Sequence, residues 1–110
     1  MAFQTGGRNC GLDYLGSADE DWSLLETLAP GTGVRFWGTD ISFPTEFSEI
    51  PTLVINIRSF ASPEGDPARV SVGYLNLLAT GFTLRISTWG DSSVIGIGVN
   101  WSAYDSASAL

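Results

Sequence analysis

Hydrophobic and polar residues alternate along the last third of the chain, residues 68–104. Because successive side chains of a β-strand point to opposite faces, each alternating run predicts a strand with one buried face. Three sets of apolar residues keep this period of two: Val70, Val72 and Tyr74; Phe82, Leu84 and Ile86; and Ile95, Ile97, Val99 and Trp101. Short turn signals separate the runs, so the stretch predicts antiparallel sheet.

Trp89 departs from this alternation. It falls on the polar side of its run, with Thr83 and Arg85, directly before the turn Gly90–Ser93. A large indole at the exposed end of a strand offers an amphipathic contact surface rather than a core residue. Arg69, on the polar side of the preceding strand, is its expected neighbour.

Further strands are expected upstream. Residues 34–43 are predicted to be extended, and their buried candidates are Phe36 or Trp37, with Ile41 and Phe43. Residues 52–60 form a stronger strand pattern, in which the apolar positions are Leu53, Ile55 and Ile57. About six short strands without a long helix or a repeat predict an all-β fold, an antiparallel β-sandwich in one domain.

The N-terminal part is less regular. Residues 1–17 are rich in glycine and polar side chains, which predicts an extended arm with some strand character at Leu12–Leu15. Residues 18–110 are then the sandwich. At the junction, Ser17–Glu20 has capping-box spacing, so a short helix near 19–28 and a turn with one core tryptophan are equally compatible with the sequence.

Charge narrows the class of partner. The 110 residues include 12 acids and five arginines but neither lysine nor histidine, for a formal net charge of −7. Nucleic-acid and anionic-membrane proteins neutralise phosphates with a basic patch, so neither partner is expected. No apolar run approaches the length of a membrane span. Neutral or weakly polar ligands fit the composition better.

Several other functions are disfavoured by the residues. Without histidine, without a nucleophile that has a plausible partner and without a phosphate loop, we expect no enzyme and no cofactor. The acidic run Asp19–Asp21 is expected to be a solvated face rather than a metal site. Cys10 is the single cysteine, so no internal disulfide forms. The first residues lack the features of a signal peptide, and we expect cytoplasmic synthesis, with any release through another route or a larger assembly.

The order of several segments resembles a known family. Six segments follow one another as in the H-type lectin domain, the type found in snail agglutinin and at the C-terminus of discoidin: Ile41-Ser42-Phe43, Phe47, Ile50–Ile57, Ala68-Arg69-Val70, Thr80–Trp89 and Val99-Asn100-Trp101. The resemblance covers about residues 38–104. It implies a six-stranded antiparallel β-sandwich that forms trimers, sometimes paired as hexamers, and binds galactose or N-acetylgalactosamine between subunits.

The same resemblance implies the site residues. Arg69 matches a sugar-contacting arginine, and Trp89 matches the tryptophan before the loop. Gly90 stands where a histidine is frequent, and Ile95 stands where the neighbouring subunit supplies a tyrosine, so two usual polar contacts are missing. Asp91 and Asp40 are possible substitutes for the family's ligand-binding aspartate, although neither aligns with it.

Both retained residues have a structural alternative. Trp89 is equally compatible with a sugar platform and with a tryptophan that supports the turn or an oligomer interface, and Arg69 with a sugar contact and an ion pair to Asp91. The sequence therefore supports two functions. One is a multivalent carbohydrate-binding protein for adhesion to cell surfaces; the other is a structural or adhesive component of a phage-like particle, docked through residues 1–17.

Overall fold

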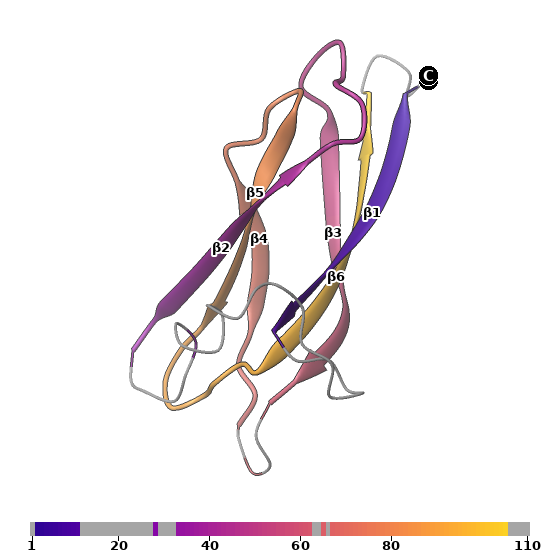
Figure 1. Ribbon diagram of the computed structural model, residues 1–110. Coiled ribbons are helices and arrows are strands. Elements are labelled where there is room, and N and C mark those ends of the chain that lie inside the picture. Colours follow the sequence, from indigo (N-terminus) through magenta and orange to yellow (C-terminus); the bar gives the residue numbers. More distant parts are fainter. Residues whose placement is uncertain (1, 12–27, 29–32, 63–64, 66, 106–110) are drawn as a thin grey trace.

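Six strands in two sheets make up the part of the chain that the computed structural model describes, namely residues 2–11, 28, 33–62, 65 and 67–105 (Figure 1). The strands are β1 (Phe3–Gly11), β2 (Arg35–Ser42), β3 (Thr52–Ala61), β4 (Ser71–Leu75), β5 (Gly81–Thr88) and β6 (Gly96–Tyr104). The sheets are antiparallel and have the orders β1-β6-β3 and β2-β5-β4. This confirms the predicted all-β sandwich.

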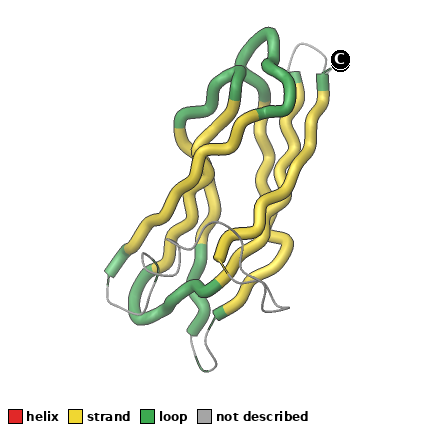
Figure 2. Tube along the Cα trace, in the orientation of Figure 1, coloured by secondary structure: helices red, strands yellow, loops and turns green. Residues whose placement is uncertain are grey.

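No helix is present within these described ranges (Figure 2), and hence none that is long and apolar enough to cross a membrane. The predicted strand character at Leu12–Leu15, the helix or turn over 19–28 and the acidic run Asp19–Asp21 lie outside the described residues, except for Leu28. Leu28 is fully buried, and its carbonyl oxygen accepts a hydrogen bond from the Val94 N–H at 3.0 Å.

The alternating pattern of the sequence produces the core. Phe82, Leu84 and Ile86 of β5 are buried, as are Ile97, Val99 and Trp101 of β6. At one end of the core the aromatic rings form a cluster, with ring centroids 5.1 Å apart for Phe43–Phe47 and 5.9 Å apart for Phe82–Trp101. Such edge-to-face pairs contribute about 0.5–1.5 kcal/mol each beyond the burial of their surface.

The structure of strand β2 shows which of its two aromatic residues, Phe36 or Trp37, is buried. Trp37 pairs with the inward-facing Ile86 and is buried. Phe36 lies on the outer face, 50% exposed, with the Arg85 guanidinium 3.7 Å from its ring centroid.

The predicted arm is extended, but its described residues belong to the sandwich. Strand β1 pairs with β6 in register from Phe3↔Tyr104 to Gly11↔Gly96. Gly6 is required in this strand because a Cβ there would overlap the Trp101 indole. Cys10, on the inward side of β1, is 1% exposed. Glycine in this segment therefore permits close packing.

Two strand boundaries differ from the prediction. Strand β4 begins at Ser71, so Arg69 lies in the preceding loop, because the chain turns at Ala68, where φ is +54°. Strand β6 begins at Gly96, so Ile95 also precedes its strand.

One edge of the sandwich is more exposed than the alternation predicts. Ile57 of β3 and Tyr74 of β4 share the inward parity of their strands, yet each is 45% exposed. Both strands are at sheet edges, where no further strand covers them, and β3 has a bulge between Ile57 and Ser59. We call this margin, where β3 and β4 contact each other, the β3–β4 edge.

Candidate functional site

Four of the predicted site residues gather at one end of the sandwich. Trp89 directly follows β5, and Arg69 lies two residues before the neighbouring β4, so the antiparallel pairing Ser71↔Ser87 brings them to the same end. The Thr88 hydroxyl donates to the Arg69 carbonyl oxygen at 2.5 Å. We call this end, with Arg69 and the loop Trp89–Ser92, the arginine site.

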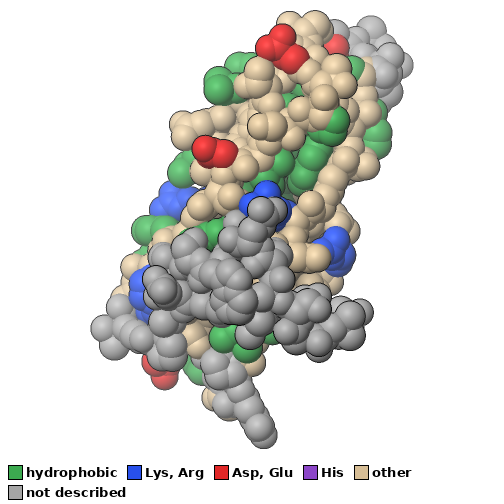
Figure 3. All heavy atoms as spheres, in the orientation of Figure 1, with side chains coloured by type: hydrophobic (Ala, Val, Ile, Leu, Met, Phe, Trp, Pro, Cys, Tyr) green, Lys and Arg blue, Asp and Glu red, His purple; other side chains and the backbone are tan. Residues whose placement is uncertain are grey.

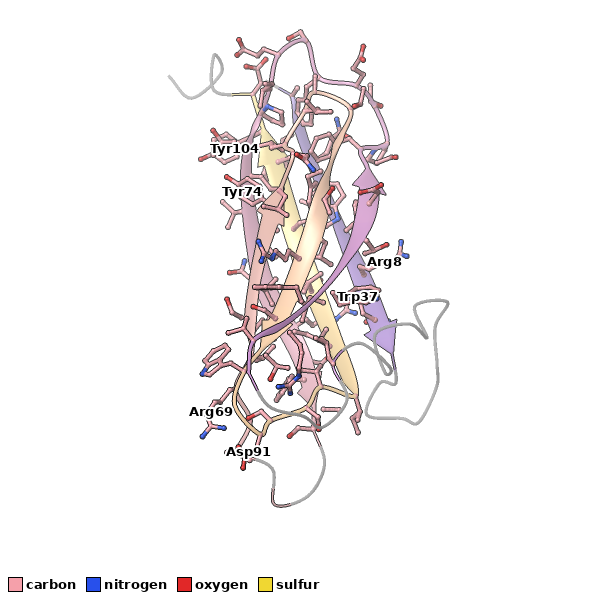
Figure 4. The ribbon with its side chains drawn as sticks, turned by 90° about the vertical axis from the view of Figure 1, so that its left-hand side faces the viewer. Arg8, Trp37, Arg69, Tyr74, Asp91 and Tyr104 are labelled. Atoms are coloured by element: carbon pink, nitrogen blue, oxygen red, sulfur yellow. The ribbon has the colours of Figure 1, made fainter. Side chains whose placement is uncertain are left out.

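Arg69 is held in place by the loop (Figure 4). Its Nη1 donates to Asp91 Oδ1 at 2.8 Å and to Ser92 Oγ at 3.1 Å, and its backbone N–H donates to the same Ser92 oxygen at 3.2 Å. The predicted ion pair with Asp91 is thereby confirmed. Ser92 is fully buried and fixes both the backbone and the side chain of the arginine.

The Arg69 guanidinium can nevertheless still donate hydrogen bonds to a ligand. The side chains of Arg69 and Asp91 are 38% and 76% exposed, so the pair is well solvated. Exposed ion pairs contribute only about 0–1 kcal/mol, and ligand hydroxyls can therefore compete for the two groups. Of the three guanidinium nitrogens of Arg69, only Nη1 has hydrogen-bond partners among the described residues. The Nη2 and Nε donors therefore remain for a ligand.

Gly90 has a conformational role in this loop. Its φ of +65° lies in the left-handed region that favours glycine. A Cβ at this position would lie 3.0 Å from Arg69 Nη1 and 3.4 Å from its Cζ. The space that a side chain would fill is therefore occupied by the guanidinium, and Gly90 offers the site only its backbone.

Arg35 supports the loop and was not singled out by the sequence pattern. Its Nη1 donates to the carbonyl oxygens of Gly90 at 2.8 Å and Gly33 at 2.7 Å, and its Nη2 donates to that of Ser92. Its Nε is buried and has no hydrogen-bond partner in the described part of the chain. Arg35 and Gly90 are 55 positions apart in sequence, so no local signal links them.

The remaining candidates lie elsewhere in the chain. Ile95 is half-buried, and its N–H donates to the Ala61 carbonyl oxygen at 3.1 Å, which connects the loop to the end of β3. Asp40 pairs with Thr83, near the other end of β5, about 20 Å from Trp89 at the rise of an extended strand. Neither residue joins Arg69 within one chain.

The arginine site is suited to a neutral, hydroxylated ligand. Trp89 is 41% exposed and presents an apolar ring, while Arg69 and Asp91 supply donors and acceptors beside it. Among the residues with described positions, no three His, Cys, Asp or Glu side chains gather as a metal-binding group. The chemistry present is therefore recognition by stacking and hydrogen bonding.

Comparison with known proteins identifies a protein family. The model of the H-type lectin domain matches residues 39–104, which include Arg69 and the loop after β5. A protein of Fuscovulum blasticum named ATP synthase subunits region ORF 7 is 26% identical over 76 residues, which cover 69% of this chain and 66% of that protein.

Solved structures share the fold. Recombinant discoidin II of Dictyostelium discoideum superposes with a TM-score of 0.74 at 24% identity, over 93% of this chain. Wild-type discoidin II gives 0.75 at 23% identity over 94% of this chain. In both comparisons the match covers 36% of the discoidin chain, so the likeness concerns one part of a longer protein.

Proposed function

The chain belongs to the H-type lectin domain family, and we propose that it binds carbohydrate of the galactose or N-acetylgalactosamine type at the arginine site. The observation that carries this proposal is the juxtaposition of an exposed indole, Trp89, with a guanidinium that is fixed by Ser92 but retains donors. A flat apolar ring suits the C–H face of a hexose, and a forked donor suits its vicinal hydroxyls.

Each group has a part in the proposed recognition. The C–H face of the hexose packs on Trp89, and vicinal hydroxyls accept hydrogen bonds from the free Arg69 donors. The Asp91 carboxylate accepts a hydrogen bond from a hydroxyl of the ligand. Each hydrogen bond to a charged group contributes only about 1.5–3 kcal/mol, and water competes for these groups because the site is solvated. We therefore expect a single site to bind its sugar weakly.

We propose further that the protein acts as a trimer, which supplies avidity to weak sites. The β3–β4 edge supports this, since Ile57 and Tyr74 leave apolar surface exposed there. The opposite margin is polar, with Arg8 Nη2 donating to Thr39 Oγ1 at 3.5 Å and Gln4 bonded to the Thr45 backbone at 2.7 and 3.1 Å. A second copy at the β3–β4 edge would bury Ile57 and Tyr74. Sedimentation distinguishes trimer from hexamer, and a monomer at micromolar concentration contradicts the assembly.

A glycan array followed by calorimetry tests the sugar proposal. Trp89→Ala and Arg69→Ala should each weaken binding to the best glycan by tenfold or more, on the order of 1.4 kcal/mol. Phe3→Ala and Arg58→Ala are matched controls, because they remove an exposed aromatic side chain and an exposed arginine from the other sheet, away from the site. Absence of binding to any glycan, or equal effects of site and control variants, overturns the proposal.

The alternative function, a structural or adhesive component of a phage-like particle, shares the trimer. It requires residues 1–17 to dock on another component. Within that segment Phe3–Gly11 are paired along their whole length with β6 of the same chain. This internal use of the segment favours glycan binding as the primary role.

A further inference from the structure

A cavity of about 340 Å³ lies at the end of the sandwich opposite the arginine site. Its walls come from the end of β2, the start of β5 and the loop between β4 and β5. Its polar lining residues are Asp40, Ser42, Asn76, Thr80 and Thr83. Its apolar lining residues include Ile41, Leu78 and Phe82. The volume falls in the range of small-ligand sites.

The cavity wall is held by backbone hydrogen bonds. The Leu78 N–H donates to the Gly81 carbonyl oxygen at 2.8 Å, and the Phe43 N–H donates to that of Thr80 at 2.9 Å. At Gly81 a Cβ would overlap the Ile41 carbonyl oxygen, so β2 and β5 approach closely there. Asn76 has a φ of +53°, a left-handed conformation that asparagine tolerates better than most residues.

Asp40 provides the only formal charge of this cavity. Its Oδ1 accepts the Thr83 hydroxyl at 2.8 Å, which leaves further lone pairs of an exposed carboxylate. The nearest arginine on the same outer face, Arg85, stacks on Phe36 instead, and no ion pair joins Asp40 to another described residue. On the face shown in Figure 3, most acidic side chains lie towards this upper end and the arginines lie below them, with one further acidic side chain at the lower left. The cavity is therefore unsuited to anions.

The wall also has the mixture of groups that a sugar requires. The Asp40 carboxylate accepts hydrogen bonds from hydroxyls, while the Asn76 amide and the Ser42 and Thr80 hydroxyls both donate and accept. Leu78, 55% exposed, adds an apolar patch for the C–H face of a ring. A metal ion would need several converging carboxylates, and only one carboxylate lines this cavity.

We propose that this cavity is a second binding site, for a neutral hexose residue, with Asp40 as its main hydroxyl acceptor. It goes beyond the arginine site, because the two lie at opposite ends of β5 and share no residue. One chain would then bind sugar residues at both ends of the sandwich.

The proposal is tested by titrating the nitrogen-15-labelled protein with methyl β-D-galactopyranoside and with methyl α-D-glucopyranoside. The amide chemical shifts in NMR spectra report where each sugar binds. We expect two separate groups of shifting amides, at residues 40–42 with 76–83 and at residues 88–93. Asp40→Asn should weaken binding at the first group by about tenfold, which corresponds to the loss of a charged acceptor. Trp89→Ala should affect the second group alone. Glu46→Gln is the matched control, because it removes a carboxylate from the same end outside the cavity.

The outcomes separate the two sites. Shifts at residues 88–93 alone leave the arginine site standing and overturn the second site, whereas shifts at 40–42 and 76–83 alone do the reverse. Equal effects of Asp40→Asn and Glu46→Gln overturn a direct contact with Asp40. Binding of ethylammonium but of neither sugar at the cavity overturns the assignment of ligand class.

Discussion

The two ends of β5 are shaped in different ways. At its C-terminal end, the arginine site owes its form to side chains, since Arg35 and Ser92 hold the loop and the guanidinium of Arg69. At its N-terminal end, backbone hydrogen bonds hold the cavity wall, and side chains only line it. A surface held by side chains depends on those single residues. A wall held by backbone hydrogen bonds should tolerate substitution of its lining side chains, although not of Gly81, where a Cβ would overlap the Ile41 carbonyl oxygen.

Arg35→Ala should have the largest effect and tests that dependence directly. Removing the guanidinium leaves the Gly90 and Ser92 carbonyl oxygens without their partner, and we expect the free energy of unfolding to fall by about 3 kcal/mol. Amide shifts should change at residues 88–93 and stay constant at 76–83. Arg35→Lys, with one ammonium, should have an intermediate effect in urea unfolding. Equal disturbance of both ends contradicts the comparison.

Gly90→Ala should have the next largest effect. The left-handed φ costs alanine about 1 kcal/mol, and the contact of the new Cβ with Arg69 adds about 1 kcal/mol more. Gly65→Ala is the matched control, because Gly65 has a φ of +81° and nothing within 4 Å of a built Cβ. Denaturant unfolding of both variants isolates the cost of the contact, and glycan affinity should fall only for Gly90→Ala. Equal losses in stability would show that the guanidinium moves without cost.

Two substitutions to glycine compare the strained residues of the two ends. Ala68 and Asn76 both have left-handed φ values, +54° and +53°. Alanine pays for this conformation while asparagine tolerates it, so Ala68→Gly should raise the free energy of unfolding by about 1 kcal/mol. Asn76→Gly should change it by less than about 0.5 kcal/mol. Thermal unfolding measures both, and a larger gain at Asn76 reverses the expected order.

Asp91→Asn should also have only a small effect on stability. The carboxylate is 76% exposed, so the loss of its ion pair with Arg69 should change the free energy of unfolding by less than about 1 kcal/mol. The difference from the parent protein should shrink further in high salt, because exposed charges are screened. If the free energy of unfolding fell by several kcal/mol in denaturant unfolding, the Arg69–Asp91 pair would behave as a buried ion pair, which contradicts its exposure.

Local sequence pattern was enough to predict the strands with a buried and an exposed face. The burial of Phe82, Leu84 and Ile86 and the exposure of Trp89 follow from alternation along β5. The pair of Arg69 with Asp91 was one of two alternatives that the sequence left open, and the structure contains it. These features depend on contacts near in sequence or across one turn, where a period of two is informative.

Features set by distant contacts could not be predicted in this way. The role of Arg35 depends on a loop 55 positions away, and that of Gly6 on the Trp101 indole. Ile57 and Tyr74 have the pattern of core residues, but their strands lie at sheet edges, which alternation does not reveal. The cavity at Asp40 likewise requires three segments to be placed in space before it can be recognised.

The buried position of Cys10 makes its thiol a natural probe of how often the sandwich opens. Its thiol is enclosed by the sandwich at the end of β1, opposite Ile97 of β6, and it is the single thiol of the chain. A thiol reagent reacts with it once a local opening of the sandwich, such as separation of β1 from β6, or unfolding of the whole chain exposes the thiol. The rate of that reaction therefore reports how often the sandwich opens at this strand, without any label being introduced.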